Sequence, residues 1–378
     1  MLEKLNIQGF RKYKDFTVKD FGQINFILGN NNIGKTSILE SIYAWACGQN
    51  AVPFFNIPLS RGRYSGIQQP YWVMEELLAS VYDRRTIPLS MIFDGVYNGR
   101  DVRFEHSIYP SELLGEYDTS YKNNSDLISV SNNSKSAGDM NPIIATVPGI
   151  FQMQQTMIAK WDVKYNDNVI STDITVPTSQ VSKVRPFKLA KYIDVLSHTG
   201  ISECIQIYAS LKREKKLDEV VNEIRKVYPE VRGFDMIPYP DGSQSPISVI
   251  KEDRVLPLYA CGDGIQRWFY ILGAFVLYKN SIICIDEIDT GFHHEAQTEF
   301  STDLIRAAVQ NGVQLFITTH NIEFLDNFLK SACTIESSGM DSRIKVITMR
   351  ETQNGLKVRT MNAKDAYNSR EHFNLELR

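Results

Sequence analysis

One short segment near the N-terminus restricts the fold more than any other part of the chain. Residues 29–36 read Gly-Asn-Asn-Asn-Ile-Gly-Lys-Thr, which fits the phosphate-binding pattern Gly-x-x-x-x-Gly-Lys-[Ser/Thr]. The apolar run 23–28 precedes it and predicts a strand, while residues 37–45 carry apolar side chains at helical spacing. Strand, glycine loop and helix in this order are the context that the pattern requires. The segment therefore predicts a P-loop nucleotide site.

Each residue type in this loop has a physical task in binding a nucleotide. Glycines let backbone N–H groups close around phosphate oxygens, and the start of the following helix adds a positive dipole end. Lys35 is expected to reach the β- and γ-phosphates of ATP, and the Thr36 hydroxyl to ligate Mg²⁺. The predicted nucleotide-binding residues of the loop are Gly29, Asn30, Asn31, Asn32, Ile33, Gly34, Lys35, Thr36 and Ser37.

Two later apolar runs end in polar residues that suit phosphate chemistry. Residues 281–285 predict a buried parallel strand, with Asp286 and Glu287 at its carboxyl end. We expect Asp286 to hold Mg²⁺, and Glu287 to orient or deprotonate the attacking water. Residues 313–319 predict a neighbouring strand that ends at His320. This histidine is expected to contact the γ-phosphate or the attacking water.

A fourth element stands between the loop and the acidic strand. Gly262, Asp263 and Gly264 come just before an apolar helix that runs through Leu277. Glycines at a helix start can form a second anion-binding site, although a plain turn is the default interpretation of Gly-x-Gly alone. The position just upstream of the acidic strand favours the anion-binding interpretation.

In this order the four elements resemble the ABC-type ATPases of the SMC and OLD-like group. Within the group they are most similar to the small ATPases paired with nucleases in bacterial anti-phage defence. The resemblance extends over most of 1–50 and 250–378, and Phe10 and Arg11 are similar to the phenylalanine-basic pair of the family's first strand. Further similar segments are the signature at 256–265, the Walker B and D-loop at 285–293, the switch-histidine segment at 318–321 and the closing segment at 373–378.

The resemblance implies a fold and an assembly. The implied fold is α/β, a P-loop ABC-type ATPase head with a mixed sheet and flanking helices, an inserted α+β lobe and no long coiled coil. It also implies a head-to-head dimer, in which each ATP lies between the P-loop of one subunit and the signature of the other. The backbone of Gly264 and the helix beginning there would then face the partner's γ-phosphate, with Gly262 and Asp263 as further nucleotide-binding residues. Asp289 would lie along the dimer seam, and Arg11 would approach the nucleotide.

Two departures from the family pattern concern the rate of hydrolysis more than nucleotide binding. Gly262 stands where the wider ABC group has the signature serine, which removes a hydroxyl donor to the γ-phosphate. The Q-loop glutamine has no clear position, since the middle of the chain offers Gln68, Gln69 and the run from Gln152 to Gln155.

The spacing of the motifs predicts the domain organisation. Most of the chain separates Lys35 from Asp286, far more than a compact P-loop enzyme needs. We therefore expect 1–50 and 251–378 to form the two parts of the ATPase head, with 51–250 inserted between them. Within the insertion we predict paired strands at 87–94 and 101–109, a mobile polar loop at about 111–142, strands at 156–175, helices between 187 and 232, and a hairpin at 234–256.

Composition limits the class of protein. Hydrophobic residues make up 43% and charged residues 22% of the 378 residues, as in an ordinary globular chain. The net charge of −3 gives no overall basic field, so any nucleic-acid contact must be local or made through a partner. No apolar run is long enough for a membrane span, and the five cysteines lack metal-binding spacing. We expect a cytoplasmic protein with no membrane contact.

The motifs and the resemblance together predict a slow or regulated ATPase. Its ATP-driven dimer is expected to gate a separate effector, a nuclease or toxin, and a phage protein or nucleic acid is expected to be the trigger. The segment after His320 is too short for a nuclease domain and has no cluster of acids for two metals, so the effector is expected to be another chain. Two alternatives stay open: an ATP-stabilised scaffold with negligible turnover, and a DNA-repair clamp that binds duplex DNA.

Overall fold

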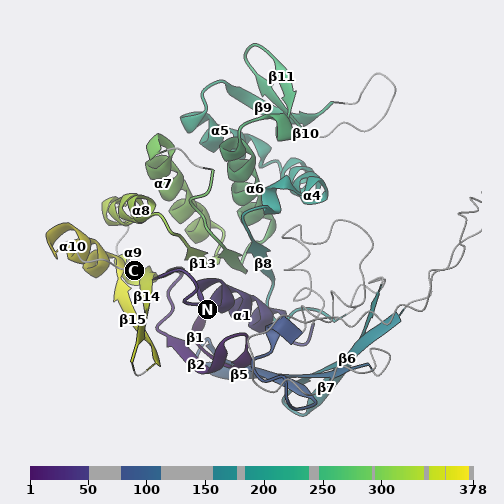
Figure 1. Cartoon of the computed structure of the whole chain (residues 1–378). Helices are drawn as coiled ribbons and strands as arrows, with labels where there is room; N and C mark the ends of the chain where they lie inside the picture. The colour runs from purple at the N-terminus through teal and green to yellow at the C-terminus, as the bar shows by residue number, and fades with distance from the viewer. Residues whose placement is uncertain are drawn as a thin grey trace, which may run out of the picture.

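The computed structural model describes residues 1–50, 78–111, 156–176, 184–237, 247–291, 294–335, 340–353 and 355–373. These residues form an α/β structure with a central, mostly parallel sheet, a second, antiparallel sheet and a small three-stranded sheet. Figure 1 shows the central sheet between a layer of helices and α1, with the antiparallel sheet beyond α1. The expected polar loop after residue 111 and the candidate Q-loop glutamines lie outside the described residues.

The central sheet contains the strands that the motifs predict. Its order is β15-β14-β3-β13-β12-β8, and all neighbours are parallel except β14 and β15. Because parallel strands share one carboxyl edge, the segments that follow β3, β8, β12 and β13 meet at that edge. The strands are β3 (Ile24–Gly29), β8 (Ala190–Ile193), β12 (Ile282–Ile285), β13 (Gln314–Thr318), β14 (Ile344–Thr352) and β15 (Gly355–Asn362).

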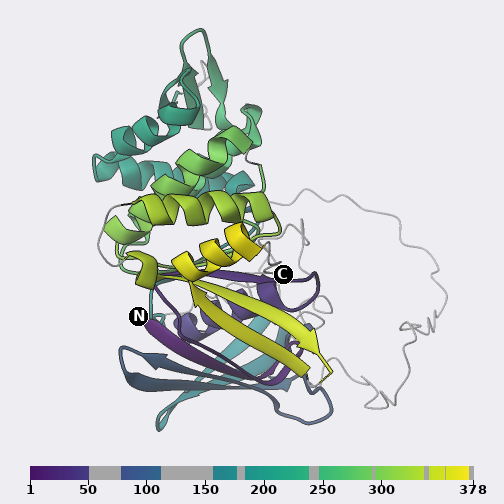
Figure 2. The same ribbon diagram turned by 90° about the vertical axis from the view of Figure 1, so that its left-hand side faces the viewer.

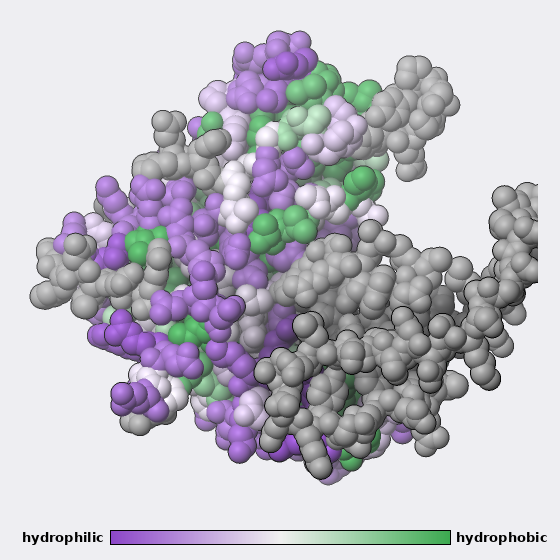
Figure 3. All heavy atoms as spheres, viewed as in Figure 1, coloured by the Kyte–Doolittle hydropathy of each residue, from purple (hydrophilic) through white to green (hydrophobic). Residues whose placement is uncertain are grey.

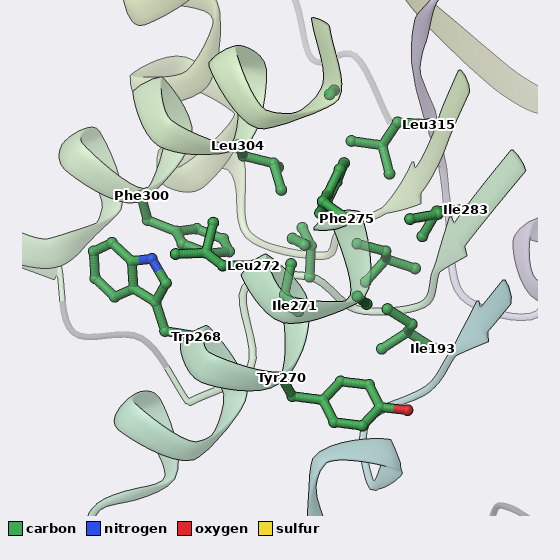
Figure 4. Close-up of a cluster of buried hydrophobic side chains, with 14 of the residues drawn as sticks. Ile193, Trp268, Tyr270, Ile271, Leu272, Phe275, Ile283, Phe300, Leu304 and Leu315 are labelled. Carbon is green, nitrogen blue, oxygen red and sulfur yellow. The ribbon is translucent and has the colours of Figure 1, made fainter. Parts of the chain in front are cut away.

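Both faces of the central sheet are buried, which explains the continuous apolar runs of its strands. Along β3, Phe26 packs in the core on the helical side and Ile27 in the core on the other side. Helices α6 (Asp263–Leu277), α7 (His294–Gln310) and α8 (Ile322–Thr334) cover one face, and α1 (Lys35–Cys47) covers the other. Figure 4 shows α6 side chains Trp268, Ile271, Leu272 and Phe275 among Phe300, Leu304, Ile283 and Leu315.

The antiparallel sheet joins the N-terminus to the middle of the chain. Its order is β2-β1-β4-β5-β6-β7, so the strands predicted at 87–109 and 156–175 are confirmed, and β4 pairs directly with β1. Trp45 of α1 is fully buried and donates its indole N–H to the Val102 carbonyl of β5 at 3.0 Å. The strands are β1 (Leu2–Phe10), β2 (Tyr13–Lys19), β4 (Leu89–Tyr97), β5 (Arg100–Pro110), β6 (Thr156–Tyr165) and β7 (Asn168–Val176).

The helical pattern expected between 187 and 232 is wrong at its two ends. At the first end, residues 190–193 form β8, which pairs in parallel with β12. This segment is too short to show a period that distinguishes a strand from a helix. The 3-10 turn η2 (Ser197–Thr199) and helices α4 (Ile201–Arg213) and α5 (Leu217–Val227) follow. At the second end, a strand begins at Val231. The expected hairpin is present as the small sheet of β9 (Val231–Met236), β10 (Ile247–Lys251) and β11 (Val255–Pro257).

The C-terminal elements pack at the β14–β15 side of the central sheet. Helix α9 (Met340–Arg343) leads into β14, and α10 (Ala363–Phe373) follows β15 and lies beside α8, as Figure 2 shows. The described surface seen in Figure 3 is mainly hydrophilic, with scattered hydrophobic residues. Among the described residues, no helix combines the length and apolar character needed to cross a membrane, and the longest is α7 with 17 residues.

A buried amide links the two large sheets. The Gln314 side chain of β13 accepts from the Leu2 N–H at 2.8 Å and donates to the Leu2 carbonyl at 2.7 Å. Its amide nitrogen also donates to the Gly22 carbonyl at 2.9 Å. The first residue of β1 is therefore held to the central sheet by a single side chain.

We expect Gln314→Met to lower the free energy of unfolding by about 2–4 kcal/mol, because the buried Leu2 N–H and C=O lose their partners. Chemical denaturation of the purified chain measures this loss. The matched control is Gln23→Met, since the Gln23 amide donates at the longer distances of 3.4 and 3.5 Å. Equal losses in the two variants would contradict the prediction.

Candidate active site

The loop between β3 and α1 has the backbone conformation that phosphate binding needs. Gly29 and Gly34 have φ angles of 150° and 108°, and Asn32 has a φ of 60°. A Cβ on Gly34 would lie 2.2 Å from the Tyr13 hydroxyl oxygen, and one on Gly29 would lie 2.7 Å from the Met349 carbonyl oxygen. Only glycine fits at these two positions. Helix α1 begins directly after Gly34, so its first N–H groups open into the loop.

Lys35 is buried and folds over the loop. Its Nζ donates to the Gly29 carbonyl at 2.7 Å and to the Asn30 carbonyl at 3.0 Å, and the residue is 5% exposed. A bound phosphate group would offer the ammonium stronger, charged acceptors than these carbonyls. The three asparagines 30–32 are exposed, Ile33 is buried, and Ser37 lies in the first turn of α1.

The β1–β2 hairpin supports the loop from the antiparallel sheet. The Tyr13 hydroxyl donates to the Gly34 carbonyl at 2.9 Å, and Lys12 Nζ donates to the Asn32 carbonyl at 2.8 Å. Arg11, which the resemblance places near the nucleotide, lies in an ion pair with α1, where its Nε is 2.5 Å from Oε2 of Glu40. The hairpin thus fixes the loop and the first helix together.

Asp286, just after β12, contacts the first turn of α1 directly. The Thr36 hydroxyl lies 3.0 Å from Oδ2 and 3.3 Å from Oδ1 of its carboxylate. The Thr318 hydroxyl donates to Oδ1 at 2.5 Å, and the Tyr192 hydroxyl donates to Oδ2 at 3.3 Å. Hydroxyl and carboxylate oxygens side by side are hard ligands of the kind that Mg²⁺ prefers. The pair Thr36 and Asp286 therefore fits the metal-binding role predicted for it.

Glu287 has an unusual backbone that is held from two sides. Its φ of 49° is uncommon for a residue other than glycine. Its N–H donates to the Thr318 hydroxyl at 2.9 Å, and its carbonyl accepts from Arg267 at 2.8 Å. Its carboxylate stays 45% exposed, with Oε1 at 3.8 Å from Nε2 of His320. The structure thus brings the predicted base and the predicted switch histidine together at the sheet edge.

The signature residues form the start of α6, after the 3-10 turn η3 (Leu258–Ala260). Gly262 is the N-cap residue, and a Cβ there would meet open space. Gly264 is tightly packed, since a Cβ would lie 2.3 Å from the Tyr228 hydroxyl and 2.9 Å from the Gly291 carbonyl oxygen. Oδ1 of Asp263 lies 2.5 Å from Nε2 of His198. The start of α6 is thus exposed at its tip and packed against the segment after β12.

Asp289, predicted at a dimer seam, follows closely after the acidic pair. Its Oδ1 accepts a hydrogen bond from the Thr319 hydroxyl at 2.5 Å. The segments after β12 and β13 are therefore joined twice, through Thr318 to Asp286 and through Thr319 to Asp289.

Three residues that hold this site were not predicted from the sequence: Tyr192, Thr318 and Arg267. Tyr192 was not predicted because its segment lies in the region expected to be helical. The pattern that could have indicated a strand is the short segment 190–193 followed by Asp194. Thr318 carried the signal of a hydroxyl at the carboxyl end of an apolar run. Arg267 is a single charge in an otherwise apolar stretch of α6, and this contrast was its signal.

We expect Thr318→Val to reduce ATP turnover by ~10–100-fold, because the hydroxyl that contacts both Asp286 and the Glu287 N–H is lost. Phosphate release at saturating ATP measures the effect. Thr318→Ser keeps the hydroxyl and is expected to retain most of the turnover. If the valine and serine variants lose turnover equally, the hydroxyl has no part in the reaction.

Two family models match the segments that build this site. The model described as "AAA ATPase domain" matches residues 1–56. The model described as "AAA domain, putative AbiEii toxin, Type IV TA system" matches residues 200–326. The first match contains the P-loop, and the second contains the start of α6, the acidic pair and His320.

Known proteins similar to this chain include a phosphatase, a DNA replication and repair protein and an Smc head domain. An ATP/GTP phosphatase of Helicobacter pylori is 22% identical over 343 residues, which are 86% of this chain and 87% of that protein. The DNA replication and repair protein RecF of Ligilactobacillus salivarius is 45% identical over 49 residues, 13% of each chain. The solved Smc head domain with an extended coiled coil, bound to the C-terminal domain of ScpA from Pyrococcus furiosus, aligns at 11% identity and a TM-score of 0.48, over 99% of both chains.

The ATPase family matches and the phosphatase relative agree with the geometry of the P-loop and the acidic strand. ATPases of this kind use ATP, typically with Mg²⁺. The chain is an ATP-hydrolysing enzyme.

Proposed function

We propose that this chain is a dimerising ATPase switch that hydrolyses ATP slowly and gates a separate effector, a nuclease or toxin, in anti-phage defence. The observation that best supports ATP hydrolysis is the contact between Thr36 and Asp286, with Glu287 at the same sheet edge. The proposed link to a toxin is supported by the family model that matches residues 200–326, because its description names a toxin of a Type IV TA system.

Hydrolysis needs a charged cradle for the phosphates and a base for the attacking water. Lys35 exchanges the carbonyls of Gly29 and Asn30 for the β- and γ-phosphates. The Glu287 carboxylate, exposed beside His320, accepts the proton of the attacking water, and His320 holds that water or the γ-phosphate in place. Mg²⁺ supplies positive charge to the phosphates when bound, and Thr36 and Asp286 are the residues that would hold it.

The proposed dimer places the start of α6 on the nucleotide of the partner. The exposed N-cap at Gly262 lies at the positive end of the α6 dipole, which suits the binding of a γ-phosphate. Asp289, tied to Thr319, would lie beside the seam between the two subunits. ATP then closes the dimer, and hydrolysis reopens it.

The effector is tested by co-purification of this chain with the products of its neighbouring genes, with bound nucleotide assayed in the same sample. A stoichiometric complex with a nuclease or toxin supports the gating proposal. A lone dimer that retains ATP overturns the effector part. Cutting or modification of nucleic acid by the purified chain alone would also overturn it.

We expect Glu287→Gln to slow hydrolysis by ~10²–10⁴-fold, because the general base is lost. The variant should still bind ATP, and it should accumulate as a closed dimer in light-scattering measurements. Glu219→Gln is the control, since the Glu219 side chain is 68% exposed on α5 and pairs only weakly with Lys216 at 3.6 Å. If Glu287→Gln keeps the function of the wild-type chain and traps no closed dimer, the scaffold with negligible turnover is favoured.

We expect Gly262→Ser to tighten the ATP-dependent dimer by about tenfold, because a hydroxyl at this position donates to the charged γ-phosphate. The φ of −58° at Gly262 and the open space around its Cβ position allow the substitution without strain. Dimer dissociation constants with and without ATP measure the gain. Gly262→Ala adds the Cβ alone, and an equal gain from alanine would show that the hydroxyl is not the cause.

The local match to a DNA repair protein makes a duplex-DNA clamp the second candidate function. A clamp binds duplex DNA with an affinity that falls steeply with salt, because phosphate contacts release counterions. Fluorescence anisotropy with a duplex probe at two salt concentrations, with and without ATP, decides between the candidates. ATP-dependent and salt-sensitive binding by the chain alone would favour the clamp.

A further inference from the structure

Arg267 is a fully buried charge in the helix that begins with the signature residues. It is 1% exposed and lies one turn after Asp263 on the same side of α6. Its guanidinium donates to three backbone carbonyls, those of Val195 at 3.0 Å, Asp286 at 3.3 Å and Glu287 at 2.8 Å. Its Nε has no hydrogen-bond partner among the described residues.

This burial works against the stability of the fold. Burial lowers the pKa of the Arg267 guanidinium from its usual value, and nearby carboxylates oppose this shift. The guanidinium nevertheless stays charged, as arginine does in proteins, so α6 buries a charge whose loss of hydration opposes folding. The carboxylates are those of Asp263, Asp289, Asp194 and Glu287.

The three carbonyls show which segments the Arg267 guanidinium connects. Val195 follows β8, and Asp286 and Glu287 follow β12, so one planar group ties two strand ends to α6. The backbone of Glu287 is held on its other side by Thr318 of β13. The left-handed backbone of Glu287 is thus held between Arg267 and Thr318. We therefore expect the direction of the Glu287 carboxylate to depend on the position of α6.

We propose that Arg267 is a positioning residue that transmits the docking of α6 on the partner's nucleotide to Glu287 of its own chain. Hydrolysis at one site then depends on ATP at the other. This inference rests on the proposed dimer, in which the start of α6 meets the partner's γ-phosphate. The rigid, planar guanidinium suits this role, because a movement of the helix carries all its donors together.

The test compares Arg267→Lys with wild type in steady-state ATP hydrolysis. Lysine keeps the charge but cannot bridge three carbonyls in one plane. We expect kcat to fall ~10–100-fold with KM changed by less than about threefold, because Glu287 acts on the chemical step and not on binding. We also expect the Hill coefficient for ATP, above 1 in wild type, to fall to 1. Arg267→Met should show the same pattern more strongly.

The matched control is Arg225→Lys. Arg225 of α5 also donates to two backbone carbonyls, those of Val231 and Arg232, each at 3.1 Å, but these lie at the small sheet. This control should leave kcat and the Hill coefficient at wild-type values. A folded Arg267→Lys with wild-type kcat and Hill coefficient overturns the inference, whereas a wild-type chain that does not hydrolyse ATP overturns the proposed function itself.

A second measurement keeps Arg267 intact and so does not depend on the folding of its variants. A mixed dimer combines one wild-type chain with one Lys35→Ala chain whose P-loop no longer holds ATP. Coupling predicts a rate well below half that of the wild-type dimer, because α6 of the active chain has no nucleotide to dock on. A rate of half the wild-type value means that the sites act independently, and it overturns the inference.

Discussion

The shared carboxyl edge of β3, β8, β12 and β13 is the constraint on which the site depends. A buried carboxylate needs hydrogen-bond donors, and Asp286 finds hydroxyl groups from three different elements at this edge, Thr36, Thr318 and Tyr192. Each donor reaches it only because the parallel register places the strand ends at one level. The same edge then presents Glu287 and His320 to solvent, where a nucleotide and a water can meet them.

The antiparallel sheet contributes to the site through the hairpin of β1 and β2. Tyr13 and Lys12 hold the carbonyls of the P-loop, and Arg11 is paired with Glu40 of α1. Because β4 pairs with β1, the strands from the middle of the chain stiffen the support of the P-loop. The residues between the P-loop and the acidic strand therefore include strands that extend the sheet begun by β1 and β2. They also include the helices α4 and α5.

Helix α6 links the chemistry of the site to its outer surface. Its apolar residues pack between the sheet and α7, so the helix is anchored along its length. Its first turn is exposed at Gly262, and its second turn places Arg267 on the carbonyls of Asp286 and Glu287. A helix with an exposed first residue and a following turn in contact with the Glu287 carbonyl is consistent with the proposed gating role.

The sequence by itself determined the local parts of this protein. The P-loop, α1 and strands β12 and β13 were predictable, because their signals lie within a few consecutive residues and reflect burial on both faces of a sheet. The tertiary structure alone decided that Tyr192 joins Asp286, that β4 pairs with β1, and that Arg267 holds Glu287. These contacts join segments far apart in the chain, and no periodicity of a single segment encodes its partner. Their physical basis is the need of buried polar groups for hydrogen bonds, which only the assembled fold can satisfy.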